Sequence, residues 1–265
     1  MQNQEETKTG NTDRQQVECL TLGTVQTPNS PSPPAVYYLD FMKKILLSWS
    51  SGKDSAWALQ VLREQGQYEV AGLLTTINSA FDRVAMHGTR RALVEMQAEA
   101  VGLPLIAAPL PWPCSNADYE QAMRLVCDQA LAQGIAAIAF GDLFLADVRA
   151  YRERQLQGTG LEPIFPIWGI PTDELARKMV ASGLRARLSC VDPRQLSPAF
   201  VGRDFDQTLL DDLPAAVDPC GENGEFHSFA YAGPMFRREL AIVTGDKVER
   251  DGFWFCDILP AITNP

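Results

Sequence analysis

The fold is decided by one stretch, residues 45–66, which reads ILLSWSSGKDSAWALQVLREQG. Residues 45–49 are an apolar run typical of a strand, and residues 48–55 form a loop of small and polar residues. A helical pattern then covers residues 55–65 and ends at Gly66, because glycine readily adopts the left-handed conformation found after a helix. A strand, a short loop and a helix in this order predict the first unit of an α/β domain.

The alternation of strands and helices continues to about Pro163. Further strands are predicted over residues 69–76, 103–108 and 135–140, and further helices over residues 89–101 and 117–133. These strands lack polar alternation, which is typical of a parallel sheet covered by helices on both faces. The predicted fold class is therefore α/β, with a doubly wound parallel sheet.

The pattern changes in the last third of the chain. A helix is predicted over residues 174–181, a strand over 184–191, and a hairpin that turns at Arg250-Asp251-Gly252 between strands at 239–249 and 253–259. This mixture predicts a smaller α+β domain that binds the substrate.

The expected domain organisation has three parts. They are a disordered tail at residues 1–40, which is rich in Gln, Asn, Thr, Ser and Pro, a nucleotide-binding domain at 42–165 and the α+β domain at 166–265.

Composition narrows the function classes. Hydrophobic residues make up 46% of the 265 residues, enough for a sizeable core, and the formal net charge is −10. An acidic balance argues against a general duplex nucleic-acid binder, which needs a surplus of Lys and Arg. The six cysteines form no C-x-x-C pair, and no apolar run is long enough to span a bilayer. We therefore expect reduced thiols, no membrane partner and a cytoplasmic location.

The loop at residues 48–55 has the composition of a phosphate site. A helix N-terminus offers unpaired N–H groups and a partial positive charge, and small residues let an anion approach. The residues expected to bind ATP are Ser48, Ser50, Ser51, Gly52, Lys53, Asp54 and Ser55, together with Gly141 from a later loop. Lys53 supplies the cation, and Asp54 is the candidate metal ligand or helix cap. The loop is not a Walker A motif, since Leu47 and Asp54 stand where that motif needs Gly and Ser or Thr.

Three further stretches carry candidate site residues: residues 86–91, 140–153 and 220–228. Gly141 and Asp142 follow an apolar strand, where ligands of open α/β sheets bind, so Asp142 is a candidate to hold Mg²⁺ or orient the substrate. Glu222 and Glu225 flank a tight polar turn that suits ammonia handling, general-base work or metal binding, and an ordinary acidic surface turn is the alternative. The candidate substrate contacts are His87, Asp147, Arg149, Arg152 and His227. A structural role for His87, and a solvated helix face for Arg149 and Arg152, are equally compatible with the sequence.

The loop resembles the S-G-G-x-D-S signature of the PP-loop ATP pyrophosphatases, with Ser51 in place of the second Gly. Together with the three later stretches, the chain resembles the diphthine–ammonia ligase family of PP-loop proteins over about residues 42–260. This resemblance implies that ATP and Mg²⁺ adenylate a carboxylate with release of pyrophosphate, and that ammonia then displaces AMP. It implies catalytic roles for Lys53, Asp142, Glu222 and Glu225.

The acceptor is left open by departures from the family pattern. Members that act on diphthine carry Glu-Gly-Gly-Glu-(Tyr/Phe)-Glu-Thr, and this chain has Asn223 and His227 where that run has a Gly and a Glu. A small molecule and a protein side chain are both candidate carboxylate acceptors. A PP-loop tRNA-modifying enzyme and a non-catalytic ATP-binding or sensor protein remain alternatives, and a homodimer is left open.

Overall fold

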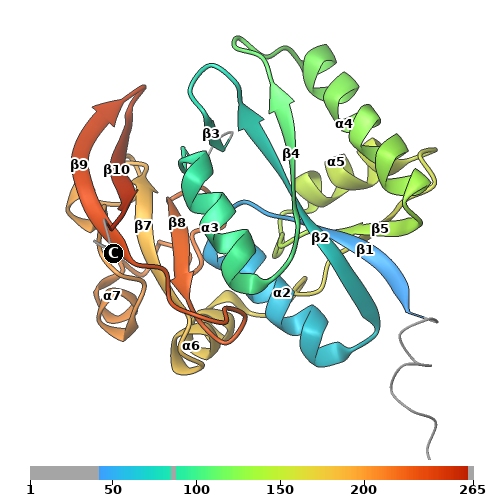
Figure 1. Cartoon of the computed structure of the whole chain (residues 1–265). Coiled ribbons are helices and arrows are strands. Elements are labelled where there is room, and N and C mark those ends of the chain that lie inside the picture. Colours follow the sequence, from blue (N-terminus) through green and yellow to red (C-terminus); the bar gives the residue numbers. More distant parts are fainter. Residues whose placement is uncertain (1–41, 85–87, 262–265) are drawn as a thin grey trace, which may run out of the picture.

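A computed structural model describes residues 42–84 and 88–261 of the chain. The expected disordered tail at 1–40 and the candidate contact His87 lie outside these residues. The described chain forms a six-stranded sheet followed by a four-stranded sheet (Figure 1).

The first sheet is the parallel sheet that the sequence predicts. Its parallel strands lie in the order β4-β2-β1-β5-β6, and the short β3 pairs antiparallel with the end of β2. The strands are β1 (Lys43–Ser48), β2 (Tyr68–Asn78), β3 (Arg83–Val84), β4 (Leu105–Leu110), β5 (Ile135–Ala139) and β6 (Glu162–Ile164). From β1 the chain first builds one half of the sheet and then returns to build the other, so the α/β doubly wound class is confirmed.

Helices cover both faces of this sheet (Figure 1). They are α2 (Lys53–Gln65), α3 (Arg91–Val101), α4 (Asn116–Ala132) and α5 (Ala146–Leu156). Alternate residues of β1 divide between the two faces: Ile45 and Leu47 pack with α2 and α3, whereas Leu46 packs with α4 and α5. Burial on both faces explains why the sequence of β1 is continuously apolar.

The second sheet is antiparallel, in the order β8-β7-β10-β9. Its strands are β7 (Arg185–Val191), β8 (Phe226–Ala232), β9 (Ile242–Arg250) and β10 (Phe253–Pro260), and the elements beside it are α6 (Thr172–Ala181), the 3₁₀ turn η1 (Pro198–Phe200) and α7 (Gln207–Asp212). The predicted hairpin turns as expected, with positive φ angles at Asp251 and Gly252. Strand β8 was not predicted: six of its seven residues are buried, but His227 and Ser228 interrupt its apolar run, so neither a continuous apolar pattern nor a polar alternation marks it.

The two sheets share one hydrophobic core. The same buried cluster contains Leu47 of β1, Leu59 of α2, Leu188 of β7 and Phe229 of β8. Strand β8 runs along the start of α2, where the Ala230 amide donates to the Ser51 carbonyl at 2.9 Å. The second sheet is therefore hydrogen-bonded to the loop that follows β1.

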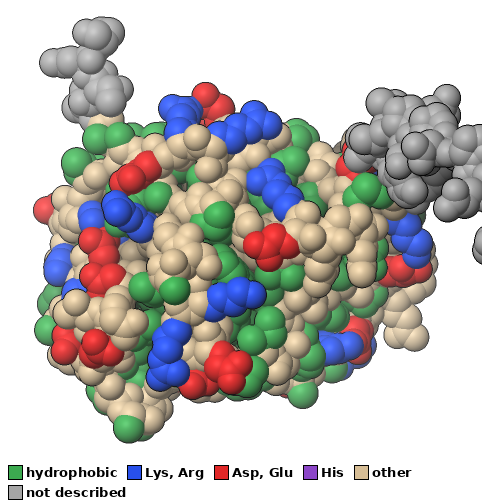
Figure 2. All heavy atoms as spheres, turned by 90° about the horizontal axis from the view of Figure 1, so that it is seen from below, with side chains coloured by type: hydrophobic (Ala, Val, Ile, Leu, Met, Phe, Trp, Pro, Cys, Tyr) green, Lys and Arg blue, Asp and Glu red, His purple; other side chains and the backbone are tan. Residues whose placement is uncertain are grey.

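The surface seen in Figure 2 carries Lys and Arg side chains interspersed with Asp and Glu, so that face offers no continuous basic patch. The cysteines within residues 42–84 and 88–261 are free thiols. No helix in that part of the chain is long and apolar enough to cross a membrane.

Candidate active site

The candidate site lies where the order of the first sheet reverses. Strands β1 and β5 are neighbours, but the chain leaves β1 for one half of the sheet and β5 for the other. The loops after the two strands therefore separate at their carboxyl ends, which is where open α/β sheets bind ligands. This edge brings residues 48–52 and 140–145 together.

Gly141 allows the two loops to meet closely. A Cβ atom at this position would lie only 3.0 Å from the Asp54 carbonyl carbon and the Ser55 nitrogen. The backbone after β5 can therefore lie against the first turn of α2 only without a side chain, and this places Asp142 beside the loop. The sequence prediction attached Gly141 to ATP, and the structure adds this packing constraint.

A cavity of about 220 Å³ opens at this junction, and we call it the loop cavity. Its walls contain these predicted site residues: Ser48, Ser50, Gly52, Lys53, Asp54, Ser55, Gly141, Asp142, Arg152, Glu222 and His227. The Ser50 and Ser55 hydroxyls are 3.1 Å apart, and the Ser55 hydroxyl also donates to the Gly52 carbonyl. The start of α2 and its serines thus form one wall, and the turn at residues 220–224 forms another.

Ser51 turns away from the loop cavity. Its φ angle is +71°, its side chain is fully buried, and its hydroxyl lies 2.8 Å from the Thr89 hydroxyl. The left-handed conformation costs a residue with a Cβ about 1–2 kcal/mol, which explains the glycine usually found here in the related signature. Ser51 was predicted to bind ATP. Its side chain instead contacts Thr89, in the segment that precedes α3.

Lys53, which was predicted to bind ATP, lines the loop cavity but is almost fully buried and paired. Its side chain is 2% exposed, and its ammonium donates to the Asp54 carboxylate at 2.8 Å and to the Cys220 carbonyl. The ammonium also lies 5.5 Å from the Phe205 ring centre and 5.4 Å from that of Phe226. Burial opposes its charge, but the nearby acidic groups, Asp54 above all, together outweigh burial and raise the pKa of Lys53. Lys53 thus fastens the loop to the 220–224 turn.

Gln97 is a positioning residue that the sequence prediction missed. Its fully buried amide accepts from the Trp49 indole at 2.8 Å and donates to the carbonyls of Ser51 and Ala230 at 2.9 and 2.6 Å. The amide therefore joins α3, the loop and β8. A glutamine between the buried residues Leu93 and Val101 of a predicted helix was the available signal, because a buried polar group needs partners.

Asp142 and Arg152 form the charged wall opposite α2. Their closest atoms are 3.4 Å apart, and the Arg152 guanidinium lies 5.1 Å from the Phe140 ring centre. Burial raises the pKa of Asp142, although Arg152 opposes the shift.

Asp147 is exposed and lies outside the loop cavity. Arg149 stacks on Phe165 and Trp168 and pairs with Glu153. The geometry therefore does not favour Arg149 as a substrate contact.

The two glutamates of the 220–228 stretch occupy different places. Glu222 faces the loop cavity and accepts from the Leu143 amide at 2.9 Å, and burial raises its pKa to about 7. Glu225 is 2% exposed and accepts from the Asp218 amide and the Asn223 side chain. Glu222 therefore lines the loop cavity, whereas Glu225 is buried within the turn and is not part of the cavity wall.

His227 follows the turn at the start of β8 and lines the loop cavity. Burial, together with the charge of Lys53, lowers its pKa to about 4. The imidazole is therefore neutral at pH 7. The next residue, Ser228, was not predicted, and its hydroxyl accepts from the Lys53 amide at 3.2 Å.

A larger cavity of about 690 Å³ adjoins the first at the ends of β1, β2 and β4, and we call it the strand-end cavity. It shares with the loop cavity the residues Ser48, Ser50, Phe140, Val148, Arg152 and His227. Asp147, Tyr119 and Met123 line its other walls. The Thr75 hydroxyl in this cavity is buried and has no partner, so it is available to a ligand.

The residues present fit a magnesium ion held mainly by a nucleotide. Asp54, Asp142 and Glu222 all line the loop cavity. The described residues contain no group of three or more His, Cys, Asp and Glu that would hold a metal by themselves. Mg²⁺ is usually bound by one or two carboxylates plus substrate phosphates and water, which this arrangement can supply.

We predict that Gln97→Leu lowers the free energy of unfolding by at least about 2 kcal/mol, because it leaves the Trp49 indole and the Ser51 carbonyl without their buried partner. Urea unfolding followed by fluorescence measures this loss. Gln60→Leu is the matched control, since the Gln60 amide bonds to the neighbouring Glu64 on α2. Equal stability of the two variants would contradict the assigned role of Gln97.

We predict that Lys53→Met lowers stability by about 1–3 kcal/mol and lowers pyrophosphate release much further than the stability loss explains. The change keeps the apolar stem but removes the donor to Cys220 and the partner of Asp54. Lys178→Met is the control, because Lys178 is an exposed lysine that lies over the Trp57 ring. Turnover unchanged in folded Lys53→Met protein would exclude Lys53 from organising the site.

Comparison with known proteins identifies the family of the chain. The model of the diphthamide synthase N-terminal domain matches residues 42–163, and that of the C-terminal domain matches residues 171–261. A Bos taurus protein named diphthine–ammonia ligase is 24% identical over 236 residues, covering 79% of this chain and 86% of its own length. The Homo sapiens protein of that name is 25% identical over 226 residues, covering 75% and 82%. A Schizosaccharomyces pombe relative of the same name is 23% identical over 80% of this chain and 38% of its own length.

The names of these relatives support a ligase. The matched models together cover most of the chain and both of its sheets. The chain therefore belongs to the diphthamide synthase family.

Proposed function

We propose that this protein is an ATP-dependent ligase that joins ammonia to a substrate carboxylate and releases AMP and pyrophosphate. The observation that carries the proposal is the loop cavity, in which the start of α2 faces Glu222 across a small space. An anion-binding helix terminus and a carboxylate that titrates near neutral pH are the two elements that adenylation and ammonia transfer require.

ATP fits the two adjoining cavities. The phosphates would lie in the loop cavity, beside the Ser50 and Ser55 hydroxyls and the start of α2, whose partial positive charge favours an anion. The adenosine would occupy the strand-end cavity of about 690 Å³, which lies in the range of small-molecule sites. The unpartnered Thr75 hydroxyl supplies a polar contact there.

In the first step a carboxylate oxygen attacks the α-phosphorus, and the bond to the β-phosphate bridging oxygen breaks. Negative charge grows on the departing pyrophosphate. The α2 amides and the serine hydroxyls face that charge, and one such preorganised donor contributes about 2.7–4 kcal/mol to catalysis. Arg152 lines both cavities and is the cation placed to orient the anionic reactants.

Magnesium bound beside Asp54 and Asp142 would supply positive charge to the phosphate oxygens. The two carboxylates already face the ammonium of Lys53 and the guanidinium of Arg152. These ion pairs hold the side chains in position at the cavity wall before any ligand binds.

In the second step ammonia attacks the acyl carbon, AMP leaves, and the nitrogen loses a proton. Glu222 is the base placed to accept that proton, because its carboxylate lies at the cavity and its pKa is raised to about 7 by burial. The Leu143 amide holds one of its oxygens. His227 is neutral at pH 7 and lines both cavities, so it would contribute hydrogen bonding rather than charge.

The acceptor is proposed to be a diphthine-like carboxylate, by analogy with the names of the relatives. Of the two departures from the family pattern, Asn223 bonds to Glu225 behind the turn, whereas His227 reaches the cavities. If this chain acts on a different acceptor from its relatives, His227 is the substituted residue placed to contact that acceptor.

The reaction is tested by incubating the protein with ATP, Mg²⁺, ammonium and candidate carboxylic acids, and by identifying the nucleotide product by mass. AMP with pyrophosphate, dependent on an added acid, is the expected result. ADP with phosphate, or ATP binding without turnover, would replace the ligase with another ATPase or with an ATP-binding sensor.

We predict that Glu222→Gln makes the protein less active but more stable above pH 7. The folded-state pKa is raised from 4.5 to about 7, so ionising Glu222 in the folded protein costs free energy as pH rises through this window. Removing that cost should stabilise the variant by about 1–3 kcal/mol at pH 8, with allowance for partial exposure. Denaturant unfolding at pH 5 and pH 8 measures the difference.

The same variant should lose the rise in amide formation through about pH 7, while ATP binding is retained. Glu64→Gln is the control, because Glu64 lies on α2 and bonds to Gln60 outside both cavities. A variant that is both fully active and unchanged in its pH profile would remove Glu222 from the ammonia step.

A further inference from the structure

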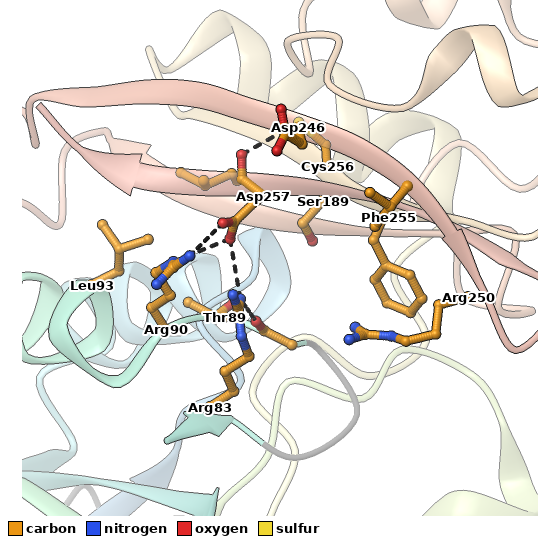
Figure 3. Close-up of a pocket in the computed structure, with 13 residues that line it drawn as sticks. Arg83, Thr89, Arg90, Leu93, Ser189, Asp246, Arg250, Phe255, Cys256 and Asp257 are labelled. Atoms are coloured by element: carbon orange, nitrogen blue, oxygen red, sulfur yellow. Dashed lines mark hydrogen bonds and ion pairs between the residues drawn. The ribbon is translucent and has the colours of Figure 1, made fainter. Parts of the chain in front are cut away.

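A third pocket lies between the two sheets and shares no lining residue with the two cavities described above. We call it the intersheet pocket. It encloses about 190 Å³ between the segment that leads into α3 and strands β9 and β10 (Figure 3). None of the predicted site residues within 42–84 and 88–261 lines it, and the proposed reaction does not use it.

The charge facing this pocket is positive. Arg83 and Arg90 both pair with Asp257, at 3.1 and 2.5 Å, and Asp257 fixes their side chains at one end. Arg250 makes no ion pair with any described residue, and its guanidinium lies 4.8 Å from the Phe255 ring centre. In Figure 3 the Arg250 guanidinium points toward Arg83. Three guanidinium groups and two carboxylates, those of Asp246 and Asp257, therefore line the pocket, which leaves an excess of positive charge.

A buried hydroxyl without a partner also lines the pocket. Ser189 is 6% exposed, and its oxygen has no hydrogen-bond partner. In Figure 3 its oxygen lies on the side of the sheet where the Asp257 carboxylate and the Phe255 ring lie. A buried hydroxyl without a partner is unfavourable, and an oxygen-bearing ligand in the pocket would supply the missing hydrogen bond.

The chemistry of the walls selects the ligand. A guanidinium recognises a carboxylate through two parallel hydrogen bonds, and the Phe255 ring offers an apolar surface beside it. A volume of about 190 Å³ admits a small acid but not a nucleotide. We propose that the intersheet pocket binds a small carboxylate anion, held by Arg250 and Ser189 with Arg83 and Arg90 behind them. This proposal does not rest on the proposed ligase reaction.

The test is isothermal calorimetry of the full chain with succinate, in the absence of ATP and at constant ionic strength. Saturable binding is expected, with Arg250→Gln weakening it about tenfold and Ser189→Ala weakening it by a smaller factor. Inorganic phosphate is titrated in parallel, and weaker binding than succinate is expected. Thermal unfolding confirms that each variant is folded.

Arg177→Gln is the matched control, because Arg177 is an exposed arginine on α6 that pairs with Asp173. Its succinate affinity should equal that of the unchanged protein. No saturable heat with succinate, or equal affinity in the Arg250→Gln, Ser189→Ala and control proteins, would overturn the proposal. Tighter binding of phosphate than of succinate would overturn the choice of a carboxylate.

Discussion

The arrangement of the site depends on the ammonium of Lys53, which joins two parts of the chain that are far apart in sequence. Lys53 is the first residue of α2, the helix that follows β1. Its ammonium donates to the Cys220 carbonyl in the turn before β8. A lysine nearly free of solvent contact is stable only when its charge is paired, and Asp54 supplies that pairing. The position of Glu222 follows from this contact, because it lies two residues after Cys220. The cation that was predicted to bind a phosphate thus also joins the two walls of the cavity.

The strands and helices of the first sheet were predictable from sequence because burial on both faces makes its strands apolar and its helices amphipathic. The predicted strand over 69–76 and helix over 117–133 differ from β2 and α4 by at most two residues at either end. Strand β8 could not be predicted, since its residues are selected by contacts with α2 that only the fold creates. The different positions of Glu222 and Glu225 could not be predicted from the sequence either. Both flank one turn in sequence, and only the path of the backbone decides which one faces the cavity.

Ser51 shows how a departure from a familiar signature can be accommodated. Its left-handed backbone is unfavourable for a residue with a Cβ, but its carbonyl receives hydrogen bonds from Gln97 and Ala230, and its hydroxyl meets Thr89. These three contacts hold the Ser51 backbone in the left-handed conformation, so the strain is offset locally. The serine therefore need not change the chemistry of the loop cavity, from which its side chain points away.

Thr89 also lines the intersheet pocket, so the Ser51–Thr89 contact connects that pocket with the loop. A carboxylate bound near Thr89 would lie one hydrogen bond away from the backbone that carries Gly52 and Lys53. Coupling between sites requires that a ligand favour one arrangement of a shared element, and this contact is a direct physical connection between the intersheet pocket and the loop. The buried side chains of Gln97 and Lys53 hold the loop on one side. Thr89 also contacts the loop, and it lines the intersheet pocket, where a small ligand can bind.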